Sequence, residues 1–283
     1  MRRRKLMVTG VVIPAKNESG RIGKVLTNIK CWSPDIIVVV ANGCEDKTVE
    51  EAIVTGPPNT HIIEFTEPLG IDVPRAVGAK YAYEFGADII VFIDGDMSGH
   101  ITPIILQLLE GIRKGSDIAL VNCYPYITQR LPLTQTMLYF RKLLNQELGL
   151  LNDLGVASPC HGPHAVSRKL LSQIGFTPLA VPPLELAMAR IYGGRIRVHA
   201  AISHIYLKSQ IRSHSHPKRV TETIIGDCIE AIRYCRGEEK NRVWEGVEYD
   251  GYNSQRRWDL LETALKNLTN LKTISREDGF NSL

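Results

Sequence analysis

The sequence lacks the features that define several large classes of protein. Its six cysteines are scattered, and no two of them stand at the C-x-x-C spacing of a zinc or redox site. No apolar run approaches the roughly 18 residues that a membrane-spanning helix needs. Internal repeats and low-complexity tracts are also missing. We therefore expect a globular protein with reduced thiols and no integral membrane segment, and not a zinc-finger, disulfide-rich or solenoid protein.

The sequence also lacks a large excess of either positive or negative charge. The chain has 34 Lys and Arg against 30 Asp and Glu, which gives a formal net charge of +4. Nucleic-acid-binding domains usually carry a strongly basic stripe, so we expect no nucleic-acid partner. The mild positive excess suits a small anionic substrate instead. The basic run at residues 2–5 is interpreted as the solvated start of a cytoplasmic protein, because Thr9, Gly10 and Pro14 interrupt the apolar stretch that follows it.

Strand-like and helix-like segments alternate through the first third of the chain. Apolar, β-rich runs lie at residues 6–15, 35–41, 60–65 and 87–94. The segments between them carry apolar residues at three- and four-residue spacing, which is typical of helices. Strands that are apolar on both faces indicate a parallel sheet covered by helices on both sides. The pattern therefore predicts an α/β fold with a mostly parallel central sheet.

The rest of the chain divides near residue 215, where its character changes. Helices are predicted at 102–114, 133–148, 168–175 and 184–192, strands at 117–123 and 195–204, and a loop at 150–164. After residue 215, two helical patterns at 217–236 and 254–272 flank a polar segment. We predict a main domain at residues 1–215 and a C-terminal helical extension at residues 216–283. The aromatic residues of this extension predict a packed subdomain or a homodimer surface.

A pair of aspartates follows the fourth strand-like run in the stretch VFIDGDMSGH. If the extended geometry persists through Gly95, Asp94 and Asp96 project to the same side of the strand. The carboxyl end of a central strand is where open α/β sheets bind ligands. Two close carboxylates repel unless a cation or a proton lies between them, and oxygen donors favour Mg²⁺ or Mn²⁺. Taken alone, the pair is equally consistent with two solvated acids in a loop.

Polar residues recur at the ends of the other predicted strands. Helix capping would account for Asn17 and Glu18, and a solvated surface charge would account for Arg75. Neither explains why such residues appear at every strand end. They are Pro14, Asn17 and Glu18 after the first strand, Asn42 after the second, and Gly70 and Arg75 after the third.

Taken in order, these segments resemble the nucleotide-sugar glycosyltransferases of the GT-A fold, family 2 and its relatives. The matching pieces are VVIPAKNE, VVANGCEDKT, LGIDVPRAVGAKYA and IDGD, within about residues 8–204. The resemblance implies a Rossmann-like domain at residues 1–215 that binds a UDP- or GDP-sugar and transfers its hexose to a small polar or phosphorylated acceptor. It also implies a divalent cofactor, Mg²⁺ or Mn²⁺.

The resemblance also implies roles for individual residues. Those implied to bind the nucleotide sugar are Pro14, Ala15, Asn17, Glu18, Asn42, Gly70, Arg75, Asp94 and Gly95, and those implied to bind the metal are Asp94, Asp96 and His204. Retaining relatives, the glucosyl-3-phosphoglycerate and mannosylglycerate synthases, are similar in the spacing of Pro159, Gly162, Ala165, Arg168, Glu185 and His204. On the acceptor side, Gly162, His164 and Glu185 are implied to be catalytic, with His161 beside them.

Two departures from the family pattern bear on mechanism. Ala41 and Cys44 replace an acid and a serine of the family's turn, which leaves the preferred base open. Pro182 and Pro183 stand where inverting members carry the acidic general base, and inversion needs a base to take the acceptor proton. The sequence therefore favours retention, in which the leaving diphosphate takes that proton.

Several assignments remain open between two interpretations. Arg130, Arg168 and Lys169 are expected to attract an anionic acceptor. The segment with His214 and His216 is equally consistent with a loop that closes over the diphosphate and with a polar linker. A sugar-phosphate nucleotidyltransferase shares the architecture, although PAKNESGRIGK only loosely matches its glycine-rich turn. The missing acids also allow a non-catalytic nucleotide-sugar-binding protein.

Overall fold

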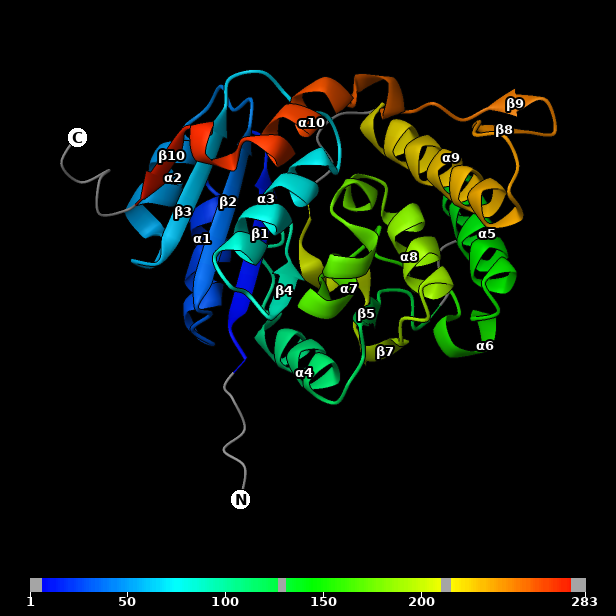
Figure 1. The fold of residues 1–283 in the computed structure, drawn as a ribbon, viewed down its shortest axis with the longest axis horizontal. Helices are drawn as coiled ribbons and strands as arrows, with labels where there is room; N and C mark the ends of the chain where they lie inside the picture. Colours follow the sequence, from blue (N-terminus) through cyan, green and yellow to red (C-terminus); the bar gives the residue numbers. More distant parts are fainter. Residues whose placement is uncertain (1–6, 127–130, 210–214, 276–283) are drawn as a thin grey trace.

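The computed structural model describes residues 7–126, 131–209 and 215–275, and its centre is one large sheet (Figure 1). Within these residues the sheet has eight strands in the order β10-β3-β2-β1-β4-β6-β5-β7. Its strands are β1 (Thr9–Ala15), β2 (Ile36–Asn42), β3 (Thr60–Phe65), β4 (Ile89–Phe92), β5 (Ile118–Asn122), β6 (His164–Ser167), β7 (Ile196–Ala201) and β10 (Thr273–Ser275). The predicted α/β class is confirmed.

Strand direction decides which residues meet at the site. Strands β3, β2, β1 and β4 are mutually parallel, and β5 is parallel to β7. Strand β6 is antiparallel to both β4 and β5, with Phe92 opposite His164. The carboxyl ends of β1 to β5 therefore lie at one edge of the sheet, where β6 begins. The residues directly after β6, from Arg168 on, begin at the opposite edge.

The helices cover the sheet as the strand order requires. The chain runs outward from β1 through α1 (Ile22–Lys30), β2 and α2 (Thr48–Thr55) to β3, then returns past β1 to β4 through α3 (Val73–Glu84). Right-handed crossovers consequently place α1 and α2 on one face and α3 on the other. Helix α3 packs on β1 and β2, as Figure 1 shows.

The helices that follow β4 cover the sheet near β5 and β7 and form a helical layer beside it. Helix α4 (Thr102–Arg113) packs on β5 and β7, while α5 (Pro132–Glu147) and α8 (Pro182–Ile191) pack against α9 (His216–Arg236). The other α-helices and strands described are α6 (Leu151–Leu154), α7 (Arg168–Ile174), the hairpin β8 (Val243–Trp244) and β9 (Val247–Glu248), and α10 (Trp258–Lys266), which packs on α3. Short 3-10 helices lie at Thr177–Ala180, His204–Leu207, Asn253–Gln255 and Leu268–Asn270.

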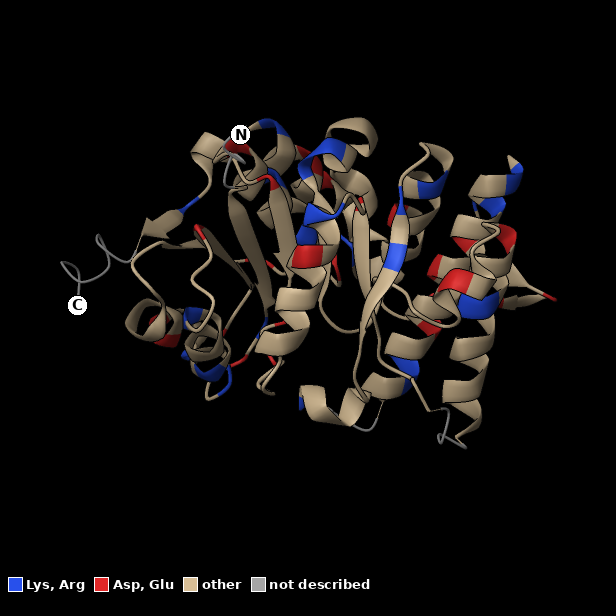
Figure 2. Ribbon diagram, turned by 90° about the horizontal axis from the view of Figure 1, so that it is seen from below, with Lys and Arg blue, Asp and Glu red and all other residues tan. Residues whose placement is uncertain are grey.

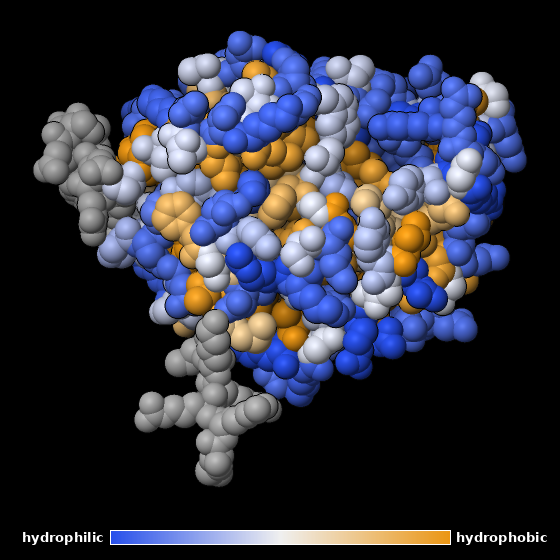
Figure 3. Space-filling model, in the orientation of Figure 1, coloured by the Kyte–Doolittle hydropathy of each residue, from blue (hydrophilic) through white to orange (hydrophobic). Residues whose placement is uncertain are grey.

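The core is apolar, and the surface mixes both charges. All seven residues of β2 are buried, as its continuous run of apolar residues predicts. Exposed apolar residues interrupt a largely hydrophilic face in small patches (Figure 3). Acidic and basic residues are interspersed along the drawn elements (Figure 2). Of the helices in the described residues, none is both long and apolar enough to cross a membrane.

Four strands were not predicted: β8 and β9, which form a separate hairpin, and β6 and β10, which join the main sheet. Strand β6 has only four residues, and β10 only three, so neither shows a readable alternation of apolar and polar residues. Strand β10 lies beyond residue 215 but pairs antiparallel with β3. The division into residues 1–215 and 216–283 stays a prediction, and the C-terminal segment contributes one edge strand to the central sheet.

Candidate functional site

The two aspartates lie at the carboxyl end of β4, but not in the geometry that the sequence suggested. Strand β4 ends at Phe92, and the backbone then folds into a turn. The N–H of Met97 donates to the carbonyl of Asp94 at 3.0 Å, and that of Ser98 donates to the carbonyl of Asp96 at 2.7 Å. The extended geometry therefore does not persist through Gly95, and the turn presents both carboxylates at the sheet edge.

Gly95 joins this turn to the end of β1. Its N–H donates to the carbonyl of Pro14 at 3.0 Å. A Cβ at this position would lie 3.1 Å from the Cβ of Ala15 and 3.2 Å from Cγ of Glu18, so the close approach favours glycine. Glu18 is buried and pairs with Arg21 at 2.7 Å. The structure thus brings together Pro14, Ala15, Glu18 and Gly95, while their role in binding a nucleotide sugar stays a prediction.

The amide of Asn42 ties the end of β2 to the loop that follows β3. Its Oδ1 accepts a hydrogen bond from the N–H of Leu69 at 2.6 Å, and its Nδ2 donates to the carbonyl of Gly70 at 3.1 Å. Asn17 lies in the adjoining loop with φ 55°, and its Oδ1 accepts from the N–H of Glu45 at 2.9 Å. Both ends of the Asn42 amide therefore hold the loop that carries Gly70.

Gly70 is required by a close contact as well as by its backbone conformation. Its φ is +92°, in the region that favours glycine. A Cβ here would lie 2.5 Å from the carbonyl oxygen of Gln255 and 2.7 Å from Cα of Arg256. The close approach that the sequence suggested at this glycine is thus made by a segment of the same chain.

This contact predicts different costs for two glycine substitutions. Gly86 has a similar φ of +90°, but a Cβ there would meet no atom within 4 Å. Gly86→Ala should lower the free energy of unfolding by roughly 1–2 kcal/mol from backbone strain alone. Gly70→Ala adds overlap with the 255–256 backbone, so we expect at least twice that loss in a denaturant titration. Equal losses would show that the contact does not restrict Gly70.

Arg75 links Asp94 to two other parts of the chain. The Arg75 side chain is 6% exposed, and its Nη2 lies 2.7 Å from Oδ1 of Asp94. Its Nε lies 3.3 Å from Oδ1 of Asp72, and its Nη1 donates to the carbonyl of Pro159 at 3.2 Å. Burial opposes the charge, but the carboxylates of Asp94 and Asp72 outweigh it and raise the pKa of Arg75. Arg75 is therefore a fixed cation beside the aspartate pair.

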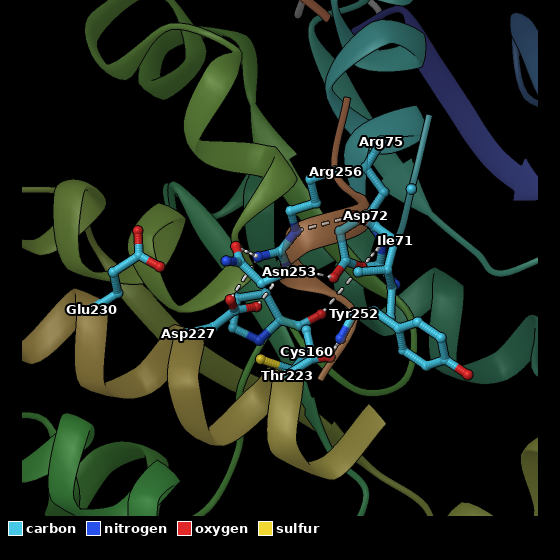
Figure 4. Close-up of polar contacts among 12 residues, drawn as sticks. Ile71, Asp72, Arg75, Cys160, Thr223, Asp227, Glu230, Tyr252, Asn253 and Arg256 are labelled. Atoms are coloured by element: carbon cyan, nitrogen blue, oxygen red, sulfur yellow. Dashed lines mark hydrogen bonds and ion pairs between the residues drawn. The ribbon is translucent and has the colours of Figure 1, made fainter. Parts of the chain in front are cut away.

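Asp72 extends this ion pair into the C-terminal segment (Figure 4). Nη2 of Arg256 lies 3.5 Å from Asp72 and 2.7 Å from Asp227, and Nη1 of Arg242 lies 2.6 Å from Asp227. Burial would raise the pKa of Asp227, but Arg256 and Arg242 outweigh burial and lower it. A continuous chain of ion pairs thus connects α9 and the segment before α10 to Asp94.

His164 and Glu185, which the resemblance assigns to the acceptor side, form a buried pair. Nε2 of His164 is 3.6 Å from Oε1 of Glu185, and both side chains are 1% exposed. The His164 ring stacks on Phe92 with 4.7 Å between centroids. Pro182 and Pro183 occupy the first turn of α8, where proline is favoured, and they start the helix that carries Glu185 inward.

Aromatic rings surround the predicted metal ligand His204. Its ring stacks on Tyr124 at 5.2 Å and lies 6.1 Å from the ring of His161. Burial, with charge from Arg141, lowers the pKa of His161 to about 3, so this ring is neutral at physiological pH. Gly162 has φ +79°, and a Cβ there would lie 2.4 Å from Sγ of Cys123. The loop at residues 159–162 therefore packs closely on the end of β5.

The expectation for Arg168 and Lys169 is wrong. Strand β6 runs antiparallel, so both residues lie at the opposite edge of the sheet from Asp94. Nη1 of Arg168 donates to the carbonyl of Tyr83 at 2.6 Å, and its guanidinium lies 3.6 Å from the centre of the Tyr83 ring. Arg130 and His214 lie outside the described residues. His216 begins α9, and its Nδ1 lies 2.9 Å from the Tyr252 hydroxyl.

The aspartate pair fits part of a divalent metal site. Carboxylate oxygens suit a hard ion such as Mg²⁺ or Mn²⁺, and the Asp94 side chain is 33% exposed. Arg75 contacts Oδ1 of Asp94, and the Ser209 hydroxyl donates to Asp96 at 3.2 Å. No group of three or more His, Cys, Asp or Glu residues in the described chain is arranged to hold a metal ion. The joint metal role of Asp94, Asp96 and His204 stays a prediction.

Sequence reasoning missed Asp72 and Arg256. Asp72 has φ 61°, which marks a constrained backbone that the sequence does not reveal. Arg256 stands 184 positions away from Asp72 in the chain, and no local pattern connects them. The fixed geometry of Arg75 depends on this distant pair.

Comparisons with known proteins agree with these features. The family model described as Glycosyl transferase family 2 matches residues 10–175. The dolichol-phosphate mannosyltransferase of Pyrococcus furiosus is 22% identical over 250 residues, which is 85% of this chain and 65% of that protein. The chain thus spans somewhat less than two thirds of this relative's length.

Solved structures of glucosyl-3-phosphoglycerate synthase from Mycobacterium tuberculosis share the fold. The complex with Mn²⁺, UDP-glucose and phosphoglyceric acid has a TM-score of 0.63 and 20% identity, over 83% of this chain and 82% of that one. The complex with Mn²⁺, UDP-glucose and glycerol 3-phosphate has a TM-score of 0.61 and 19% identity over the same shares. At these identities the likeness concerns the fold.

Proposed function

The chain belongs to glycosyl transferase family 2 and has the GT-A architecture, and on this basis we propose a metal-dependent glycosyltransferase. Its donor is a UDP- or GDP-hexose, and its acceptor is a small polar or phosphorylated molecule. One observation carries the proposal: Asp94 and Asp96 stand at the carboxyl end of β4, with the buried cation Arg75 fixed 2.7 Å from Asp94. A cation beside acidic metal ligands suits a diphosphate with its ion.

The residues divide into a donor group and an acceptor group. Pro14, Ala15, Asn17, Glu18, Asn42, Gly70, Arg75, Asp94 and Gly95 are assigned to the nucleotide sugar, and all of them follow or end strands at one sheet edge. Gly162, His164 and Glu185 are assigned to the acceptor side. Phe92 connects the two groups, because it ends β4 and stacks on His164.

A bound Mg²⁺ or Mn²⁺, held by Asp94 and Asp96 with His204 as the further predicted ligand, would supply a Lewis acid for the departing diphosphate. Arg75 orients the Asp94 carboxylate and adds a positive charge beside the donor. In the transfer, the bond between the anomeric carbon and the diphosphate breaks and a bond to the acceptor oxygen forms. The acceptor proton passes to the diphosphate oxygen that leaves.

Retention of anomeric configuration is the proposed stereochemistry, and the residues on the acceptor side support it. Inversion requires a general base that faces the acceptor hydroxyl. Glu185 is 1% exposed and paired with the buried His164, and the positions of the usual acids are the helix-starting Pro182 and Pro183. We assign Glu185 to a positioning and electrostatic role on the acceptor side, and we propose that the leaving diphosphate takes the proton.

The products distinguish this function from the other two interpretations. Incubation with Mn²⁺ and a nucleotide sugar should release nucleoside diphosphate, slowly without acceptor and faster with one. Release of pyrophosphate from a nucleoside triphosphate and a sugar phosphate would instead identify a nucleotidyltransferase. Tight binding with no release would identify a binding protein. Liquid chromatography of the nucleotides separates these outcomes.

Donor preference should appear as selective thermal stabilisation. A ligand at 100 times its Kd stabilises the native state by about 2.7 kcal/mol. For a chain of this size we expect the matching nucleotide sugar with Mn²⁺ to raise Tm by roughly 5–10 °C. Mn²⁺ alone and nucleotide without metal are the controls. Equal shifts for every UDP- and GDP-sugar, or no shift at all, would contradict a specific donor site.

Location and assembly are proposed on the sequence. The protein is taken to act in the cytoplasm, and the aromatic C-terminal segment is the proposed homodimer surface. These two assignments do not enter the chemistry above.

A further inference from the structure

Arg141 is a buried cation that forms no ion pair with any carboxylate among the described residues. It lies on α5, its exposure is 2%, and it is the largest side chain among those that are almost fully buried. Its Nε and Nη2 atoms are buried and make no hydrogen bond. The other buried arginines, Arg75, Arg242 and Arg256, each contact a carboxylate within 3.5 Å. Arg141 is therefore the exception among buried arginines of the described residues.

Leaving such a group unpaired is costly. Removing a charge from water without an ion pair or hydrogen bonds is among the least favourable burials in a protein. The buried carboxylate of Asp227 is already engaged, because it pairs with Arg242 and Arg256. The guanidinium instead lies 5.8 Å from the centre of the Tyr124 ring. An apolar side chain at this position would give a more stable core, so stability alone does not explain the arginine.

Other buried polar atoms without a hydrogen-bond partner lie in or near the loop at residues 159–162. Nε2 of His161, both ring nitrogens of His164 and Oε1 of Glu185 are buried and have no hydrogen-bond partner. Tyr124 contacts Arg141, His161 and His204, so one ring connects this cluster to the predicted metal ligand. The carbonyl of Pro159, at the start of the loop, accepts from Arg75 on the donor side. Residues 159–161 thus separate the donor cation from Arg141.

We propose that Arg141, with His161 and Tyr124 beside it, binds the oxyanion of the acceptor, a phosphate or a carboxylate. A guanidinium forms two parallel hydrogen bonds to such a group, and Nε and Nη2 are the pair of donors that it uses. The His161 residue is half-buried, while its Nε2 and the two Arg141 donors are buried. This site replaces Arg168 and Lys169, which the fold places at the other sheet edge. The inference rests on the proposed transfer reaction, because it names that reaction's acceptor class.

Inorganic phosphate is the first probe, at constant ionic strength with chloride as the control anion. Phosphate should raise the Tm of the wild-type protein, and Arg141→Gln should bind phosphate about 10- to 100-fold more weakly, since a hydrogen-bonded charge is lost. Lys142→Gln is the matched control: it removes the same charge from the neighbouring exposed position on α5 and should respond like the wild type. Arg141→Lys serves if the glutamine variant does not fold. It should bind several-fold more weakly than wild type, because a lysine has no planar fork.

Acceptor kinetics separate the sources of the anion. Glycerol 3-phosphate, glycerate and glycerol present a phosphate, a carboxylate and neither group, and vesicles of phosphatidylcholine with and without dolichyl phosphate present a lipid phosphate. Arg141→Gln should raise the KM of whichever anionic acceptor is used, by the same 10- to 100-fold, and leave donor hydrolysis without acceptor unchanged. Transfer to glycerol as efficient as transfer to the anions would overturn the proposal.

The failure of this inference is distinguishable from that of the proposed function. Phosphate stabilisation that is equal in wild type and Arg141→Gln, or absent from both, overturns the anion site even if donor hydrolysis is observed. Conversely, phosphate stabilisation that depends on Arg141, in a protein that hydrolyses no nucleotide sugar, supports the anion site and removes the proposed transfer reaction.

Discussion

Replacing Asp94 with asparagine is expected to lower the turnover number for sugar transfer by roughly a thousandfold, because metal stabilisation of the departing phosphate contributes several kcal/mol. The substitution keeps the size of the side chain but removes the negative charge from the end of β4. It also leaves Arg75, whose side chain is 6% exposed, with Asp72 as its remaining acidic partner. Asp94→Asn should therefore lose stability as well as activity. Steady-state kinetics and a thermal melt measure the two effects.

Asp96→Asn separates the catalytic loss from the structural one. Asp96 is half-buried and makes no ion pair with Arg75, so its substitution should lower turnover to a similar extent with a smaller change in Tm. Asp259→Asn, at an exposed position on α10, is the control and should keep full activity. Near-normal turnover in both Asp94→Asn and Asp96→Asn would show that the pair does not bind the metal.

Breaking the ion-pair chain at Arg256 should have the largest effect on stability. The Arg256 side chain is fully buried and lies 2.7 Å from Asp227 and 3.5 Å from Asp72. Removing one partner of a buried pair typically costs about 3–5 kcal/mol, because the remaining charge stays buried. Arg256→Gln should thus lower Tm by roughly 10 °C in a chain of this size. Arg257→Gln, one residue further on and exposed, should leave Tm almost unchanged.

Arg256→Gln should also weaken binding of the nucleotide sugar at the donor site. Arg256 holds Asp72, and Asp72 orients Arg75 toward Asp94, so the glutamine variant should raise the KM for the nucleotide sugar below its melting temperature. Arg256→Lys, which keeps the charge, should recover part of that KM. A loss of stability with an unchanged donor KM would show that the C-terminal segment supports the fold without positioning the site.

Those parts of the site that follow continuous apolar runs were predictable. Strand β3 occupies residues 60–65 as predicted, and β2 differs by a single residue at each end, because fully buried parallel strands have an unmistakable composition. Parallel strands also bring their carboxyl ends to one edge. For this reason Asn42 and Gly70, and likewise Arg75 and Asp94, are in contact, as expected of residues that share a site.

The rest depended on strand direction and on distant contacts. The short, unpredicted β6 reverses the chain, which carries Arg168 and Lys169 away from the site and leaves His164 at it. Pro182 and Pro183 looked like lost catalytic acids, whereas the fold uses them to begin α8. The pairing of Asp72 with Arg256 and the isolation of Arg141 arise only when helices far apart in sequence pack together.

The most direct test of the account is a calorimetric titration of nucleotide sugar into the protein with Mn²⁺, repeated with a chelator and with the double variant Asp94→Ala, Asp96→Ala. We expect metal-dependent binding of a UDP- or GDP-sugar by the wild type, and a loss of that binding both with the chelator and in the double variant. Unaltered binding by the folded double variant would contradict it.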